Sequence, residues 1–155
     1  MKGKLFAWML VVCWMLVIFT FSQMTGSSSG KRSGSILSKI VSIFVEEDKV
    51  DEVTEKLHYP FRKMCHFAEF FILAILVYNL LMFYEFTSKH LILYTLLWCF
   101  LYACSDEIHQ VFVDGRGPAF MDVLFDTIGS ITYLGINALF LHKKKRWLIS
   151  SFFVK

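Results

Sequence analysis

Three ionisable side chains at helical spacing open one apolar stretch of this 155-residue chain. Arg62, His66 and Glu69 follow one another at intervals of four and three residues, which places them on one face of a helix. A histidine beside carboxylates can give and take a proton near neutral pH, and an arginine can hold an anion. The spacing therefore predicts an acid/base group with an anion-binding neighbour.

Two more polar stripes occur later in the chain. Asp106, His109 and Gln110 share one helical face, whereas Glu107 lies off that face and is expected to contact loops or lipid headgroups. The other stripe consists of Asp122, Asp126 and Gly129. A glycine in such a stripe lets a neighbouring helix approach closely.

These stripes give a candidate site with assigned roles. We expect His66 to be the general acid/base, Glu69 and Asp106 to orient it, and Arg62 to stabilise an anion. The other predicted binding residues are Gln23, Glu107, His109, Gln110, Arg116, Asp122 and Asp126. Arg116 lies on a predicted tight turn and can grip a phosphate or carboxylate, or simply contact lipid phosphates.

Less specific interpretations stand beside these assignments. Arg62 can be a structural ion-pair partner of Asp122 or Glu69. Lys63 is expected to extend its side chain so that the ammonium reaches the membrane surface. His66 and His109 could supply metal ligands together with the carboxylates, but they lie on different helices and no H-E-x-x-H motif is present. We predict neither a metal nor a cofactor.

Other catalytic chemistries lack their motifs. A serine nucleophile would have to be Ser22 or Ser105, and neither has the flanking glycines of a nucleophile elbow. The chain contains no G-x-x-x-x-G-K phosphate loop, which excludes ATP-driven transport by this chain alone.

The composition indicates what must position these residues. Hydrophobic residues make up 56% of the chain and charged residues 19%, with a mean hydropathy of +0.55. In soluble domains, hydrophobic residues average about 45–50% and charged residues about 25%. This excess excludes disorder and argues against a soluble fold. The net charge of +3 is too small to indicate a nucleic-acid surface. The sequence predicts an all-α integral membrane protein of one domain, residues 1–155.

Four apolar segments can cross a bilayer, which requires about 20 residues. Their approximate ranges are 5–21, 64–86, 91–110 and 119–141. The third is apolar only from Leu91 to Cys104, so its polar continuation to Gln110 must be submerged and face protein or water. The first segment can alternatively be read as a signal peptide, although no A-x-A cleavage site follows it.

The loop over residues 22–62 has two parts. Residues 25–35 are rich in glycine and serine, which is typical of a flexible linker. Residues 36–57 carry apolar side chains at helical spacing, which predicts an amphipathic helix or helix pair on the outer surface. We expect it to cover the bundle, with partner binding as the alternative. The four cysteines show no C-x-x-C spacing and are expected to be free, buried thiols.

Four spans place both termini on one side. Lysines and arginines are balanced between the two sides, and Arg62 and Lys63 count against a cytoplasmic location of the termini. The compact basic cluster of residues 143–146 favours it. In this orientation the polar ends of all four spans meet at the outer face of the membrane.

The polar motifs resemble the VanZ-like family of small bacterial membrane proteins. The matching fragments are Phe21-Ser22-Gln23, Arg62-Lys63-x-x-His66-Phe67-x-Glu69-Phe70, Ser105-Asp106-Glu107-x-His109-Gln110-x-Phe112 with Gly115-Arg116, and Asp122-Val123 with Asp126-x-x-Gly129. Their order and spacing match over nearly the whole chain except the loop of about residues 25–57. The family pattern has proline before the Gly-Arg pair, whereas Asp114 stands here. This departure weakens the assignment of Arg116 as an anion grip.

The resemblance implies a role in lowering susceptibility to teicoplanin-type lipoglycopeptide antibiotics. An outward-facing polar site within the bilayer would suit a lipid-linked cell-wall precursor, a phospholipid or a lipoglycopeptide. The residues leave three other functions open: an intramembrane acid/base enzyme acting on a lipid headgroup, a structural or accessory subunit whose polar cluster locks the bundle, and a proton-coupled transporter, which four spans would form only as a dimer.

Overall fold

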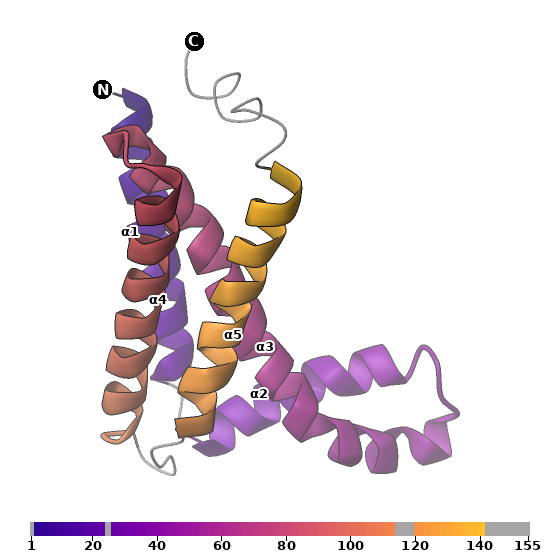
Figure 1. Ribbon diagram of the computed structural model, residues 1–155. Coiled ribbons are helices and arrows are strands. Elements are labelled where there is room, and N and C mark those ends of the chain that lie inside the picture. The colour runs from indigo at the N-terminus through magenta and orange to yellow at the C-terminus, as the bar shows by residue number, and fades with distance from the viewer. Residues whose placement is uncertain (1, 24–25, 114–119, 142–155) are drawn as a thin grey trace.

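The computed structural model describes residues 2–23, 26–113 and 120–141, and this part of the chain contains helices but no strand (Figure 1). The helical elements are α1 (Lys2–Ser22), α2 (Gly26–Val41), a 3₁₀ turn (Glu47–Lys49), α3 (Val50–Leu81), a second 3₁₀ turn (Met82–Tyr84), α4 (Ser88–Gln110), α5 (Phe120–Ile136) and a π-helical turn (Asn137–Leu141).

The helices α1, α3, α4 and α5 form an up-and-down bundle (Figure 1). The end where α1 and α4 finish and α5 begins is called the base below. The start of α1 and the end of α5 lie at the opposite end. Helix α3 contacts all four other α-helices. Its apolar face supplies the centre of the core, where Phe70, Leu73 and Val77 have no exposed surface.

Three of the described helical segments are long and apolar enough to cross a membrane: Lys2–Ser22, Glu47–Tyr84 and Ser88–Gln110. Helix α5 has 17 residues and falls short alone, since about 1.5 Å per residue gives about 26 Å against a hydrocarbon core of about 30 Å. The π-helical turn continues it to Leu141. The prediction that the polar tail of the third segment remains helical is confirmed, because α4 extends to Gln110.

Aromatic side chains gather at the end of the bundle opposite the base. Trp8 on α1 donates its indole N–H to the hydroxyl of Tyr84 at 3.0 Å, and the ammonium of Lys4 lies 3.6 Å from the centre of the Tyr84 ring. The rings of Phe86 and Tyr94 meet edge to face at 5.1 Å. Amphipathic aromatic rings with a lysine are typical of a membrane–water boundary.

Helix α2 and the first part of α3 form a helical hairpin that projects sideways from the base, and we call it the arm (Figure 1). Leu37 and Val41 are its buried apolar contacts, and the Ser33 hydroxyl lies 2.7 Å from the His58 ring nitrogen Nε2. Pro60 lies inside α3, where it removes a backbone hydrogen bond and accounts for the bend between arm and bundle.

The arm corrects two expectations. Residues 26–35 are helical and not a flexible linker, because packing of α2 against α3 overrides the weak helix propensity of glycine and serine. Of the two arrangements predicted for residues 36–57, a single helix or a helix pair, the structure has the pair: α2 ends at Val41 and α3 begins at Val50. The arm also extends away from the bundle and does not cover it (Figure 1).

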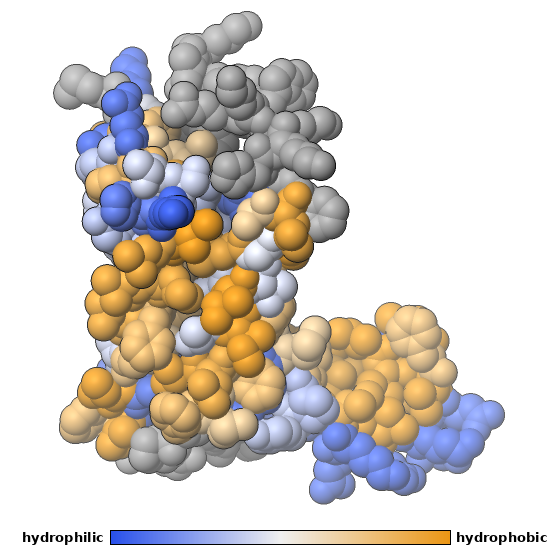
Figure 2. Space-filling model, in the orientation of Figure 1, coloured by the Kyte–Doolittle hydropathy of each residue, from blue (hydrophilic) through white to orange (hydrophobic). Residues whose placement is uncertain are grey.

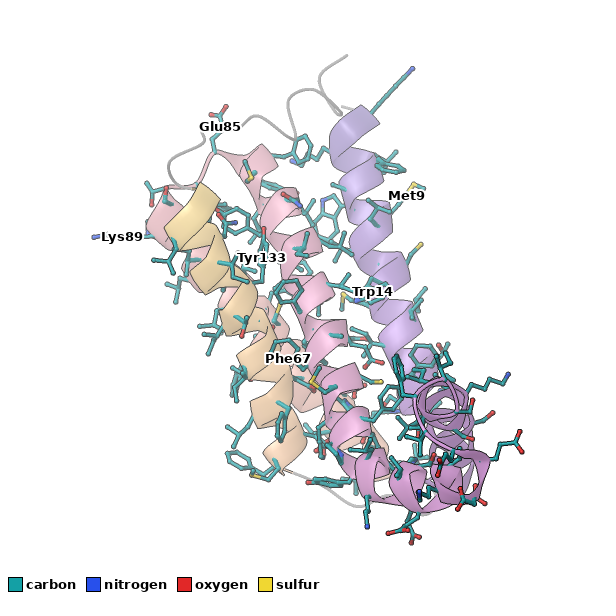
Figure 3. All side chains as sticks on the ribbon, turned by 90° about the vertical axis from the view of Figure 1, so that its right-hand side faces the viewer. Met9, Trp14, Phe67, Glu85, Lys89 and Tyr133 are labelled. Carbon is teal, nitrogen blue, oxygen red and sulfur yellow. The ribbon has the colours of Figure 1, made fainter. Side chains whose placement is uncertain are left out.

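Helices α3 and α5 approach closely at Gly129. A Cβ atom placed on Gly129 would lie 2.3 Å from the carbonyl oxygen of Phe67, so only glycine fits. The Ser130 hydroxyl donates to the carbonyl oxygen of Phe70 at 3.3 Å. Figure 3 shows Phe67 and Tyr133 at this interface and Trp14 of α1 directed toward α3. The close approach brings the polar residues of both helices together at the base.

Candidate functional site

A group of buried polar side chains lies at the base, and we call it the basal polar cluster. Its members come from α3, α4 and α5, and their exposed fractions run from 1% for Asp126 to 9% for His66. They are Lys63, His66, Asp106, Glu107, Gln110, Asp122 and Asp126. The predicted convergence of three polar stripes is therefore present, although the stripes on α3 and α4 differ in part from those expected.

Lys63 joins α3 to α5 through an ion pair with Asp122. Both side chains are buried, with exposed fractions of 9% and 4%. The expectation that Lys63 extends to the membrane surface is wrong. Of the two carboxylates considered as ion-pair partners of Arg62, Asp122 and Glu69, Asp122 is paired with Lys63. The reason is helical register. Lys63 and His66 continue the buried face of Phe70, whereas Arg62 lies one position away and is half-buried.

His66 lies beside Asp126, which comes from α5. The His66 Nδ1 atom is 3.5 Å from Asp126 Oδ1, a distance for an ion pair but with no hydrogen bond formed. Glu69 was the expected orienter of His66. It is half-buried and lies within electrostatic range of the ring, while its backbone carbonyl accepts the Trp14 indole N–H at 2.9 Å. Asp126 is thus a carboxylate beside His66 in addition to the expected Glu69.

The α4 residues of the cluster are Asp106, Glu107 and Gln110. The Gln110 amide donates to Asp106 Oδ2 at 2.8 Å, and Asp106 also lies within electrostatic range of His66. Ser22 at the end of α1 is buried next to Asp106, although its hydroxyl does not reach hydrogen-bond geometry. Glu107 lies off the face of Asp106, His109 and Gln110, but it is 7% exposed and belongs to the cluster.

Besides the half-buried Arg62, three predicted binding residues lie outside the cluster or outside the described residues. Gln23 is exposed, since α1 ends one residue earlier with Ser22 turned inward. His109 is half-buried on another face of α4, where its ring packs against Phe19 at 4.6 Å. Arg116 and its predicted turn fall in residues 114–119, which the structure does not describe.

Several buried polar atoms of the site have no hydrogen-bond partner among the described residues. They are Ser22 Oγ, Arg62 Nε, His66 Nδ1, Asp106 Oδ1, His109 Nδ1 and Asp126 Oδ1. Leaving a buried polar atom unpaired costs about 1–3 kcal/mol, and more for a charged group. Such atoms are exceptions in folded proteins and point to a functional site.

The described residues contain no group of three histidine, cysteine, aspartate or glutamate side chains arranged to hold a metal ion. All four cysteines are free, as expected, but only Cys99 is buried, while Cys13 is exposed on the outer face of α1. What the arrangement offers chemically is a histidine between carboxylates, with a half-buried guanidinium within electrostatic range.

The comparison with protein families assigns the chain. The model of the VanZ/LLP1 family matches residues 6–141, which include most of α1, the arm, the basal polar cluster and α5. The chain belongs to the VanZ/LLP1 family. No curated protein and no solved structure matches it. For this VanZ/LLP1 protein the resemblance inferred from the motifs is therefore confirmed, and its apolar helices together with the family make it a membrane protein.

Sequence reasoning missed Lys63 as a site residue of the VanZ/LLP1 chain. The signal was present in the apolar residues that follow it. Phe70, Leu73 and Val77 form the buried stripe of α3, and stepping back by seven and four residues from Phe70 reaches Lys63 and His66. Extending the apolar stripe into the polar region would have placed Lys63, and not Arg62, on the interior face.

Proposed function

We propose that this VanZ-like protein lowers the susceptibility of a bacterium to teicoplanin-type lipoglycopeptides, and that the basal polar cluster binds or modifies a lipid-linked or amphiphilic molecule. The observation that carries the proposal is the set of buried polar atoms without partners, His66 Nδ1, Asp126 Oδ1 and Asp106 Oδ1 above all. A cluster that served only to lock the helices would be expected to satisfy these atoms within the protein.

The site is proposed to face outward, with four spans and both termini in the cytoplasm. The burial of Lys63 against Asp122 supports this orientation, because it removes one of the two cations that counted against it. The remaining terminal-side lysines include Lys2, Lys4 and Lys89. Retention of the first span, as opposed to its cleavage, is supported by Val11 and Ile18, which α1 contributes to the core.

The arm is proposed to lie in the membrane surface as an amphipathic hairpin. Its exposed apolar side chains include Ile36, Ile40, Ile43 and Phe44. Figure 2 shows apolar surface on the upper side of the arm, which is the side toward which the bundle extends from the base. Polar surface runs along the lower side of the arm. A bilayer that surrounds the bundle would contact that apolar side, and water the other.

A second candidate function is acid/base catalysis on a lipid headgroup. The approach of His66 to Asp126, both buried, favours it, since a carboxylate beside an imidazole orients the ring and stabilises its protonated form. In this scheme His66 transfers the proton, Asp126 and Asp106 hold the ring, and Arg62 stabilises an anion. The structural alternative rests on the Lys63–Asp122 pair.

Substitutions in the cluster test the proposal. Teicoplanin susceptibility and the yield of folded protein in the membrane are measured for His66→Ala, Glu69→Gln and Asp106→Asn. Glu55→Gln is the matched control, because Glu55 is an exposed carboxylate on the arm. We expect the cluster variants to retain their yield and lose the reduced susceptibility, and the control to retain both.

Two other outcomes contradict the proposal. If yield and phenotype fall together in every cluster variant, the cluster is structural. If both survive, the site is wrongly assigned. A comparison of membrane lipids with and without the protein separates binding from catalysis, since an enzyme must leave an altered lipid species that His66→Ala abolishes.

A further inference from the structure

An apolar groove runs along the bundle above the basal polar cluster. It has a volume of about 540 Å³, within the range of about 300–1,000 Å³ usual for ligand sites. Residues of α1, α3, α4 and the turn before α4 line it, among them Met15, Leu97 and Tyr102. The groove lies along segments that are apolar enough to be embedded in a bilayer. Its natural occupant is a hydrocarbon chain.

Tyr102 connects the groove to the cluster. Its ring lines the groove and packs against Phe70 at 6.1 Å, and its hydroxyl donates to the Met15 carbonyl oxygen at 2.6 Å. Asp106 follows Tyr102 after four residues, about one helical turn or 5.4 Å toward the base. A chain lying in the groove would therefore bring an attached polar head to Asp106.

The charges of the cluster select the kind of head. Lys63 is paired with Asp122, whereas Asp106 and Asp126 have no lysine or arginine partner among the described residues. A protonated His66 would balance one of these two carboxylates and leave the other. Asp126 lies within electrostatic range of Asp106 and Glu107, and Oδ1 of both Asp106 and Asp126 has no hydrogen-bond partner. Buried carboxylates are stabilised by a cation that also donates hydrogen bonds.

We infer that the site binds a membrane lipid whose headgroup carries a primary ammonium, with one hydrocarbon chain in the groove and the ammonium at Asp106 and Asp126. A primary ammonium has three N–H donors, enough for both unpartnered oxygens. The inference rests on the proposed function in taking the cluster as an amphiphile site, and it names the class of amphiphile.

The test uses the full chain in detergent with equal amounts of phosphatidylethanolamine, phosphatidylcholine and phosphatidylglycerol of identical acyl chains, and counts bound lipids by native mass spectrometry. Phosphatidylcholine keeps the positive charge but has no N–H donor, so it is the matched headgroup. We expect about tenfold preference for phosphatidylethanolamine over both, the ratio that one charge-assisted hydrogen bond supports.

Variants locate the binding. Asp106→Asn and Asp126→Asn should each reduce the preference to near unity, whereas Asp48→Asn, on the exposed part of the arm, should leave it unchanged. Leu97→Trp fills the groove and should weaken all three lipids alike. Helical content and elution volume establish that each variant is folded. If Asp126→Asn does not fold, the lipid preference of Asp106→Asn alone tests the inference.

Equal binding of phosphatidylethanolamine and phosphatidylcholine by the unmodified chain would overturn the inference, as would a preference that survives both aspartate variants. Neither result touches the susceptibility phenotype of His66→Ala, so failure of the lipid class and failure of the proposed function are read from different measurements.

Discussion

Lys63 on α3 and Asp122 on α5 form an ion pair whose side chains are 9% and 4% exposed. It is placed where α3 and α5 reach the base, beside the second cross-helix approach of His66 and Asp126. Separating such a pair leaves one uncompensated charge in a medium of low dielectric constant, which costs about 3–5 kcal/mol. The pair therefore contributes strongly to the stability of the contact between α3 and α5.

Lys63→Ala is expected to lower the thermal stability of the purified protein sharply, because it leaves Asp122 buried and unpaired. Lys63→Met combined with Asp122→Leu should recover most of the loss, since neither charge remains. Unfolding in detergent, followed by circular dichroism, measures both. Lys56→Ala is the control: its pair with Glu52 is 70% and 67% exposed and should contribute less than about 1 kcal/mol. Equal losses of stability in Lys63→Ala and Lys56→Ala would show that burial does not determine how much an ion pair stabilises this protein.

Gly129→Ala is expected to destabilise the protein by about 1–3 kcal/mol, as overpacking does. The new Cβ would lie 2.3 Å from the Phe67 carbonyl oxygen, which is backbone and cannot rotate away. Gly135→Ala is the matched change on the same helix, with no atom within 4 Å of the added carbon. It should leave stability unchanged or raise it by up to about 1 kcal/mol. A comparison of the two midpoints of unfolding checks the prediction, and a neutral Gly129→Ala would contradict the close approach.

Glu85→Gly is expected to stabilise the turn before α4. Glu85 has φ of 55°, the left-handed region that costs a residue with a side chain about 1–2 kcal/mol and suits glycine. Glu55→Gly introduces the same change within α3, where it should destabilise by about 1 kcal/mol. Opposite signs in thermal unfolding support the argument, whereas a loss of stability in both variants would refute it.

The arm should rest in the lipid headgroup region. A polarity-sensitive fluorophore attached at Phe44→Cys, in a chain with its native cysteines replaced by alanine, is expected to report an apolar environment in vesicles and to be quenched by lipids that carry a shallow nitroxide. Phe44 is 81% exposed on the arm, so the label need not disturb the core. The same label at Glu52→Cys should be quenched by iodide in the water. Aqueous quenching of both labels would place the arm away from the membrane.

The orientation of the chain can be measured with fusion reporters. A reporter inserted at Gly30 in α2 is expected to be active outside the cytoplasm, and one fused after Lys155 is expected to be active inside it. The basis is the excess of terminal-side lysines that remains once Lys63 is assigned to the buried pair. A cytoplasmic signal from Gly30 would move the basal polar cluster to the inner face and rule out direct contact with an extracellular antibiotic.

Much of the fold follows from local patterns in the sequence. Apolar runs of sufficient length indicated the bundle helices, and the short third run correctly required that its polar continuation, with Asp106 and Gln110, face protein. The helicity of residues 26–35 was not foreseeable in this way, because glycine and serine have low helix propensity and only packing against α3 compensates for it.

The sequence by itself determined that this is an all-helical membrane protein of the VanZ-like type, with polar residues grouped at the ends of its apolar segments. Hydropathy and residue spacing are local properties, and they are enough for this much. Tertiary structure alone decided the partners: Lys63 with Asp122, His66 with Asp126, and Glu107 inside the cluster. Partner choice depends on the rotation of each helix about its axis. One residue shifts that rotation by about 100°, and packing between helices sets it, as at Gly129 against Phe67.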